Sequence, residues 1–196
     1  MIPKSRHAEL ETTPLSYNQQ SLWFIDQLSG SIQYHIPIVF RIEGDLSKKA
    51  LQKALVEIVN RHEILRTVVS EKDGDVFQKI LEINLFELKS KEVPKEELAK
   101  EIAGIVKSPF DLTCDHMIRA WLLSHGDETQ ILVIILHHIA FDGASTSIFK
   151  TELWENYKAF SKGEYVYVKD ILPFSQTKVI SHAYESGKVV EILATV

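Results

Sequence analysis

Ile131-Leu-Val-Ile-Ile-Leu136, followed at once by His137-His-Ile-Ala-Phe-Asp-Gly143, is the stretch of sequence that decides the fold. Six apolar residues in a row, four of them β-branched, predict a strand that is buried on both faces. Buried helices contain similar runs, but the short length and the β-branching favour the strand. Gly143 and Ser145 then open a helix that extends to about Phe160. Two histidines therefore lie at the exit of a core strand, where many α/β proteins place their sites.

The paired histidines, His137 and His138, are candidates for proton transfer. An imidazole titrates at about pH 6.5, so it can take and return a proton at neutral pH. A single histidine at a strand end is more often only a hydrogen-bonded or surface residue. Together with Asp142, the pair is also a rival candidate for a metal site. Neighbouring residues on a strand point to opposite faces, which makes the two imidazoles poor co-ligands, and we therefore predict no metal.

Length and composition indicate an ordinary globular protein. The 196 residues suit one domain, or one lobe of a larger protein. A formal net charge of -5 argues against a nucleic-acid partner, which needs a basic surface. No apolar run approaches the roughly 18 residues of a membrane span, and no secretory signal is visible. The single cysteine, Cys114, excludes an internal disulfide and fits a reducing, cytoplasmic location, and we expect a passive thiol.

The beginning of the chain combines a loose segment with a helix. Residues 1–13 are polar, and we expect a flexible lead-in there. Ser16 and Gln19 have the spacing of a capping box, which predicts a helix over about residues 17–28 with Gly30 at its C-terminal cap. We expect three apolar side chains to anchor this helix in the core: Leu22, Trp23 and Phe24.

The remaining chain predicts strands and helices. Residues 36–42 alternate in polarity, which indicates a strand with one buried face. An amphipathic helix begins at Ser47 and ends near Arg61, Asp73 with Gly74 marks a tight hairpin turn, and residues 89–100 predict a solvated helix start. Further strands are predicted over residues 64–69, 76–80, 83–88 and 117–124. The last helix is expected to end at Gly163 and to bury Ile148, Phe149, Leu153, Tyr157 and Phe160.

Four segments resemble the motifs of condensation domains from nonribosomal peptide synthetases. Leu15-Ser-Tyr-Asn-Gln-Gln-Ser-Leu-Trp-Phe24 is similar to their opening motif, Leu-Ser-x-x-Gln-x-x-Leu-Trp-Phe. Arg61-His-Glu-Ile-Leu-Arg-Thr67 resembles Arg-His-Glu-x-Leu-Arg-Thr, and His137–Gly143 resembles His-His-x-x-x-Asp-Gly. Ser108-Pro-Phe-Asp-Leu112, with Ile118-Arg-Ala120 shortly after it, resembles the family's Pro-Phe-Asp-Leu segment and the strand that follows. The shorter His-x-x-x-Asp pattern is shared with chloramphenicol-acetyltransferase-like acyltransferases.

The resemblance covers residues 14–173 and has two departures. Ser21 stands where the family usually has Arg, and residues 174–196 do not continue the family's pattern. The resemblance implies an α/β, chloramphenicol-acetyltransferase-like two-layer sandwich with a mixed sheet and flanking helices. We expect residues 14–173 to be the N-terminal lobe only, residues 174–196 to be an off-register tail, and the C-terminal lobe to be missing from a truncated chain.

For the site, the resemblance points to His138, His137, Asp142 and Gly143. It implies that His138 faces a tunnel between two lobes, as a general base or as a group that positions the amine and stabilises the tetrahedral intermediate, with His137 packed behind it. Asp142 either orients the imidazole or forms a buried ion pair with Arg119, and we favour the ion pair. Gly143 either allows close approach of the backbone to the substrate or only opens the helix.

A second set of residues is expected to support the structure. Arg61, His62 and Arg66 lie at the junction of a helix and a strand, so we predict a polar network that anchors one to the other. His62 is therefore not expected to be catalytic.

The activity that the resemblance implies is amide-bond formation between aminoacyl or peptidyl thioesters on carrier proteins. It implies no intrinsic cofactor, because the phosphopantetheine arm belongs to the carriers. The expected partners are these carrier proteins and a C-terminal lobe or neighbouring synthetase modules. Two alternatives stay open: a stand-alone acyltransferase that uses CoA or a carrier, and a non-catalytic, carrier-binding or vestigial fragment. An epimerising relative shares the double histidine.

Overall fold

The computed structural model describes residues 13–125, 129–161 and 167–170. Residues 1–12 of the predicted lead-in, the helix end at Gly163 and the tail predicted over residues 174–196 lie outside the described residues. The last residue of that lead-in, Thr13, lies in a short strand and not in a loose segment. No helix within the described ranges is long and apolar enough to cross a membrane.

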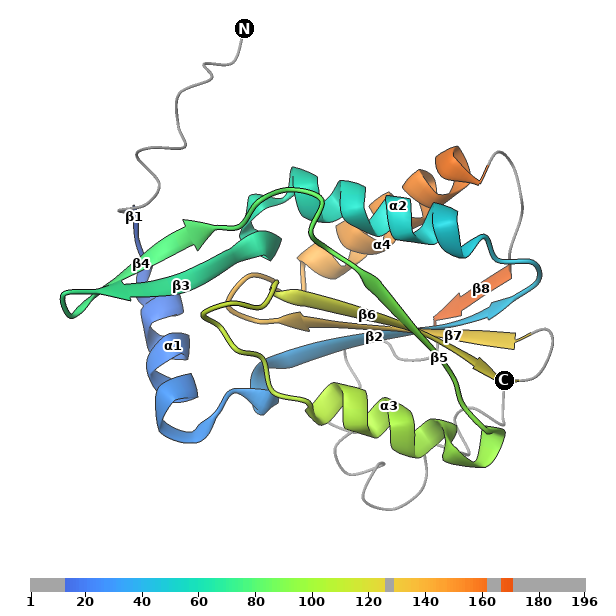
Figure 1. Ribbon diagram of the computed structural model, residues 1–196, viewed down its shortest axis with the longest axis horizontal. Coiled ribbons are helices and arrows are strands. Elements are labelled where there is room, and N and C mark those ends of the chain that lie inside the picture. The colour runs from blue at the N-terminus through green and yellow to red at the C-terminus, as the bar shows by residue number, and fades with distance from the viewer. Residues whose placement is uncertain (1–12, 126–128, 162–166, 171–196) are drawn as a thin grey trace, which may run out of the picture.

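A mixed five-stranded sheet forms the centre of the molecule, as predicted (Figure 1). Its order is β5-β6-β7-β2-β8, in which only the β5–β6 pair is parallel. The strands are β2 (His35–Glu43), β5 (Leu88–Glu92), β6 (Ile118–His125), β7 (Thr129–His137) and β8 (Tyr167–Asp170). The stretch that ends in the two histidines is therefore the central strand of the sheet.

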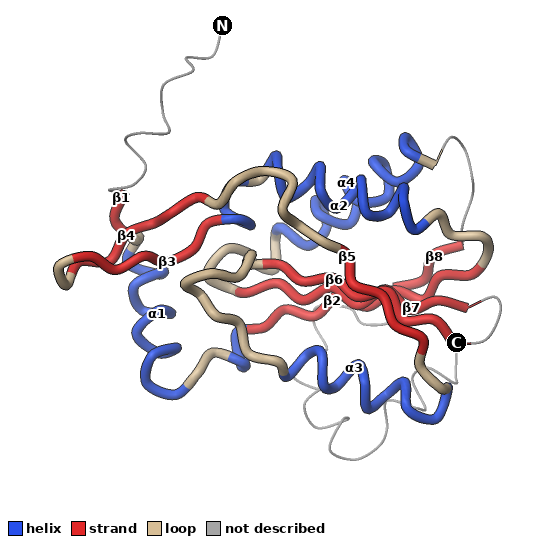
Figure 2. Tube along the Cα trace, in the orientation of Figure 1, coloured by secondary structure: helices blue, strands red, loops and turns tan. Residues whose placement is uncertain are grey.

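Helices cover both faces of this sheet (Figures 1 and 2). The helices α2 (Lys48–Arg61) and α4 (Ser145–Phe160) lie side by side on one face, and α3 (Leu98–Lys107) lies on the other. Residues 131–136 of β7 are buried throughout, because their side chains alternate between the two cores. The prediction of a strand buried on both faces is confirmed.

The strand β2 is also buried on both faces, so the prediction of one buried face was wrong. Ile38 and Ile42 face the core under α2 and α4. Val39, on the opposite face, is fully buried in the core that contains Ile102 and Ile105 of α3. The alternating pattern of β2 is typical of a strand with one exposed face. The pattern of β2 alone does not indicate that α3, more than fifty residues later in the chain, covers the second face.

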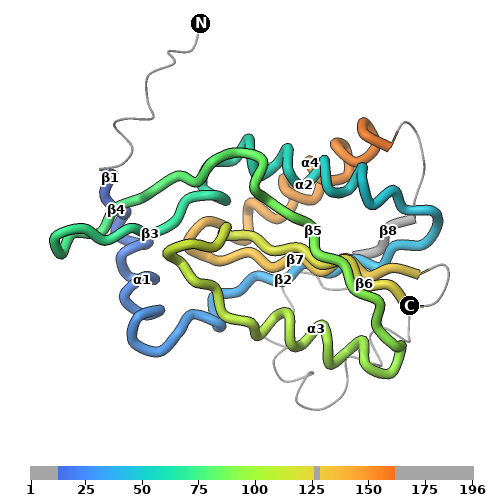
Figure 3. The backbone as a smooth tube through the Cα atoms, in the orientation of Figure 1, coloured from blue at the N-terminus to red at the C-terminus, as the bar shows by residue number. Residues whose placement is uncertain are grey.

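A second, smaller layer lies at the histidine end of the sheet (Figure 3). It consists of α1 (Tyr17–Ser29) and a three-stranded sheet of β1 (Thr13–Pro14), β4 (Asp75–Ile80) and β3 (Thr67–Lys72). The predicted capping box is present, since Ser16 and Gln19 exchange side-chain hydrogen bonds with each other's backbone N–H. The predicted hairpin turn is also present, with positive φ at Asp73 and Gly74.

Two predicted sets of core anchors are partly wrong. In α1 no residue is fully buried, and Phe24 is 62% exposed, because the helix caps the end of the sheet instead of packing across it. In α4 three of the predicted anchors are buried, Phe149, Leu153 and Tyr157, whereas Ile148 is 60% exposed because it points away from their stripe. Phe160, at the end of α4, is exposed as well.

Three predicted element boundaries also differ. A single 3-10 turn, η3 (Glu63–Arg66), precedes β3, so the strand begins only at Thr67. The strand predicted over residues 83–88 begins instead at Leu88, and another 3-10 turn, η4 (Lys95–Glu97), precedes α3. Leu88 is the only buried residue of β5, so this edge strand carries almost no hydrophobic pattern.

Candidate active site

The two adjacent histidines occupy opposite environments at the end of β7. His137 is the last residue of the strand and is 0% exposed, whereas His138 is exposed. The alternation of side chains along a strand separates them, as predicted. Among the described residues, no group of three or more His, Cys, Asp or Glu side chains is arranged to hold a metal ion.

Backbone carbonyls hold both the ring and the main chain of His138. Its Nδ1 lies 2.8 Å from the carbonyl oxygen of Phe141, and its backbone N–H donates to the carbonyl oxygen of Tyr34 at 2.9 Å. A carbonyl oxygen only accepts, so Nδ1 carries the hydrogen, and the neutral ring keeps the Nε2 lone pair for a substrate. The sequence did not reveal Phe141 and Tyr34 as partners, because any residue type supplies a carbonyl.

His138 lies in an open groove with a volume of about 750 Å³. One wall is α1, which contributes amide and hydroxyl side chains, including Asn18, Gln19 and Ser21. The other wall is the loop after β7, with Ile139 and Phe141. The groove therefore combines one imidazole with a neutral, hydrogen-bonding wall.

The carboxylate of Asp142 accepts hydrogen bonds at the start of α4, and within the described part of the chain no hydrogen bond joins it to the imidazole of His138. Its Oδ1 accepts from the backbone N–H of Ser145 at 2.8 Å and from the Ser145 hydroxyl at 2.6 Å. These hydrogen bonds hold the pKa of Asp142 below its usual range. Gly143 does not have positive φ, and its carbonyl accepts from Thr146 N–H, so in this structure it serves the entry into α4.

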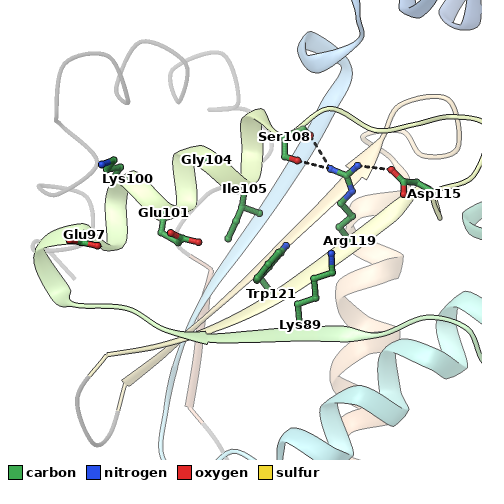
Figure 4. Close-up of a pocket in the computed structure, with 10 residues that line it drawn as sticks. All are labelled: Lys89, Glu97, Lys100, Glu101, Gly104, Ile105, Ser108, Asp115, Arg119 and Trp121. Atoms are coloured by element: carbon green, nitrogen blue, oxygen red, sulfur yellow. Dashed lines mark hydrogen bonds and ion pairs between the residues drawn. The ribbon is translucent and has the colours of Figure 1, made fainter.

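The predicted ion pair between Arg119 and Asp142 was wrong. Arg119 Nη2 lies 2.7 Å from Asp115 Oδ2, and the guanidinium also donates to the carbonyl oxygen of Ser108 (Figure 4). It donates to the carbonyl oxygen of Pro109 as well. The guanidinium stacks 3.9 Å from the ring centre of Phe110. Arg119 therefore fastens the loop before β6 to that strand, because Asp115 offers a nearer carboxylate than Asp142.

Figure 4 also shows a second hollow, between α3 and the strands β5 and β6, with a volume of about 580 Å³. Cationic and anionic side chains alternate around it, with Lys89 5.2 Å above the ring of Trp121. It lies on the face of the sheet that α3 covers, and neither histidine of the motif lines it.

The motif around His62 joins two helices. His62 Nε2 lies 2.7 Å from Glu152 Oε2 in α4, and Arg61 Nη1 lies 3.4 Å from Glu152 Oε1. The predicted network exists, but it anchors α2 to α4 and not to a strand, because Glu152 is the carboxylate that faces the end of α2. Arg66 is separate and buried, and its Nη1 donates to the carbonyl oxygen of Leu81 at 2.6 Å.

The sequence of the chain is similar to those of known proteins. The family model described as "Condensation domain" matches residues 9–187. The chain is 42% identical over 139 residues to a probable non-canonical nonribosomal peptide synthetase, CymA, of Salinispora arenicola, which covers 70% of this chain and 2% of that protein. It is 36% identical over 156 residues to the dimodular nonribosomal peptide synthase of Bacillus subtilis, which covers 78% of this chain and 7% of that protein.

Solved structures show the same fold. The X-domain from teicoplanin biosynthesis, in complex with OxyB, superimposes with a TM-score of 0.72 at 25% identity, over 98% of this chain and 41% of that chain. The starter condensation domain of rhizomide synthetase RzmA gives 0.70 at 21% identity, over 78% of this chain and 39% of that chain. The chain thus spans about two fifths of these structures. Because the family model covers most of its length, the chain belongs to the condensation-domain family of nonribosomal peptide synthetases.

Proposed function

We propose that this chain carries the amide-bond-forming site of a peptide synthetase, with His138 as its catalytic residue. The observation that carries the proposal is the fixed ring of His138. A carbonyl holds its Nδ1 hydrogen, and the ring lines the groove beside α1. A neutral imidazole with a free Nε2 lone pair can accept a proton at neutral pH.

The proposed reaction joins two carrier-bound thioesters. The acceptor amine attacks the donor thioester carbon, a C–N bond forms, and the tetrahedral intermediate then expels the donor's thiolate as the C–S bond breaks. His138 Nε2 takes the proton that the amine loses and returns it to the leaving sulfur. Because a thioester is already activated, alignment of the amine in the groove supplies a large part of the acceleration.

The proposed substrates reach the site on phosphopantetheine arms of carrier proteins, and the chain itself holds no cofactor. Beyond its phosphate, the arm is an uncharged chain that contains amide groups. Among the described residues, Asn18, Gln19 and Gln78 line the groove with matching donors and acceptors, and no Lys or Arg lines it.

We further propose that residues 14–173 are the N-terminal lobe and that a C-terminal lobe closes the groove. Large apolar side chains are exposed around the histidine end, including Phe24 and Ile64. Exposed apolar surface of this kind is typical of a protein–protein interface.

The test is a condensation assay with a donor aminoacyl carrier and an acceptor aminoacyl carrier. The chain is assayed alone and with a supplied C-terminal lobe, each against His138→Ala. His125→Ala is the matched control, because His125 pairs with Thr129 at the opposite end of β7 from His137. We expect product only with both lobes, and loss of at least about a hundredfold in His138→Ala but not in the control.

Two outcomes would contradict the proposal. Efficient use of an acyl-CoA in place of the donor carrier would identify a stand-alone acyltransferase. A folded two-lobe complex with no product under any condition would identify a non-catalytic or vestigial fragment.

A further inference from the structure

His35 is a second buried histidine beside the site, and no motif includes it. It lies directly opposite His137 in the β2–β7 ladder and is 4% exposed. The ring centres of His35 and His137 are 5.9 Å apart. Phe110 meets both rings edge to face, at 5.0 Å from His35 and 5.6 Å from His137.

Hydrogen bonds to the backbone assign the hydrogens on both rings. His35 Nδ1 lies 2.7 Å from the carbonyl oxygen of Val106, at the end of α3, so this nitrogen is the donor. His137 Nδ1 accepts from the backbone N–H of Ile139 at 3.1 Å, so this nitrogen is the acceptor. Burial lowers the pKa of His35, and it lowers the pKa of His137 to about 4, so both rings are neutral at pH 7.

The two remaining nitrogens are complementary. In a neutral His35, Nε2 is an acceptor, and in a neutral His137, Nε2 carries the hydrogen. Both Nε2 atoms are buried, and neither has a hydrogen-bond partner among the described residues. The ring contact therefore brings a donor and an acceptor into one buried cluster, without a hydrogen bond between the two Nε2 atoms.

We propose that His35 is a positioning residue that acts on His138 through His137. The chain of contacts runs from the Val106 carbonyl through His35 to His137, and from His137 to the backbone N–H of Ile139, the residue after His138. The end of α3 thereby sets the conformation of the loop that aims the reacting imidazole. This positioning role rests on the proposed condensation, whereas the assignment of hydrogens to the ring nitrogens of His35 and His137 does not.

The first test needs no activity. Long-range ¹H–¹⁵N NMR of the full chain at pH 7 reports which nitrogen of each imidazole carries hydrogen. We expect His35 to be protonated at Nδ1 and His137 at Nε2, with the signals assigned by their disappearance in His35→Gln and His137→Phe. Protonation of His35 at Nε2, or of His137 at Nδ1, would overturn the proposal.

The second test separates polarity from volume at His35. His35→Phe keeps a ring against Phe110 but has no donor or acceptor, whereas His35→Gln keeps both. In the two-lobe assay we expect His35→Phe to lower kcat roughly tenfold with little change in KM, because the groove wall from α1 is untouched, and His35→Gln to restore much of it. Circular dichroism and thermal unfolding verify that both variants are folded.

Equal kcat values for the two variants, or wild-type kcat for His35→Phe, would overturn the positioning role. If the unmodified two-lobe protein forms no product, the proposed function fails, and the NMR result alone then decides whether the hydrogen assignment of His35 and His137 is correct.

Discussion

Arg61 and Arg66 belong to one sequence motif but lie in opposite environments, which leads to a specific prediction for stability. The side chain of Arg66 is 6% exposed, and that of Arg61 is 51% exposed. Arg66 donates to the carbonyl oxygen of Leu81 at 2.6 Å and to Glu63 at 3.1 Å. Arg66→Met retains most of the volume but removes the donor from the Leu81 carbonyl.

The size of the effect follows from these contacts. A hydrogen bond from a charged donor contributes about 1.5–3 kcal/mol, and the half-exposed Glu63 partner adds less than about 1 kcal/mol. Arg66 Nε is buried without a partner among the described residues, so its removal offsets part of the loss. We expect Arg66→Met to lower the free energy of unfolding by about 2 kcal/mol, and Arg61→Met by less than about 0.5 kcal/mol.

Urea denaturation of the full chain at pH 7, followed by circular dichroism, measures both values. Similar m-values across the wild type and the two variants would show that the difference lies in stability and not in the compactness of the unfolded state. In thermal scans the same loss lowers the Tm of Arg66→Met by roughly 4–8 °C. An equal loss in the free energy of unfolding for the two variants would refute the argument. It would mean that burial does not decide how much each arginine of the motif contributes to stability.

Three further predictions concern pH, the cap of α4 and the hairpin. Burial lowers the pKa of His137 from 6.5 to about 4, so the unfolded chain binds more protons in this range. The free energy of unfolding should therefore decrease as the pH is lowered from 6.5 to about 4, by up to about 1.4 kcal/mol per pH unit. His137→Phe should remove that slope in urea titrations. Asp142→Asn keeps an oxygen that can cap α4, so we expect condensation rates within a factor of about two, whereas a triad role would cost about 10⁴-fold. Gly74→Ala should lower the free energy of unfolding by about 1 kcal/mol, because residue 74 has positive φ. Gly104→Ala in α3 should raise it by about 0.5–1 kcal/mol, because alanine favours the helix and has room there, and thermal unfolding measures both changes.

The sequence predicted best those elements whose signal is strong and local. The run that forms β7 is long, apolar and β-branched, and the capping box of α1 is complete within four residues. The strand β5 was misplaced because only Leu88 of its residues faces the core. Edge strands with charged side chains carry little periodicity, and their pairing depends on segments distant in the chain.

The sequence also separated the two histidines of the motif, since the alternation of a strand requires it. It did not identify the partners of Asp142 and Arg119. Each of these side chains has a nearer hydrogen-bonding group, Ser145 and Asp115 respectively, within four residues along the chain. His35 was missed for a different reason, because its role depends on the register between β2 and β7, which no local pattern encodes.

The pairing of β2 with β7 has a consequence for how the chain folds. The two strands meet in register from His35 opposite His137 to Glu43 opposite Thr129, roughly a hundred residues apart in sequence. Closing so long a loop is slow, and the two strands that pair with β2, which are β7 and β8, are made late in synthesis. Until β7 leaves the ribosome, β2 has apolar side chains on both faces and an unpaired edge, the combination that favours aggregation. A nascent chain that stops short of His137 should therefore depend on chaperones far more than one that has passed it.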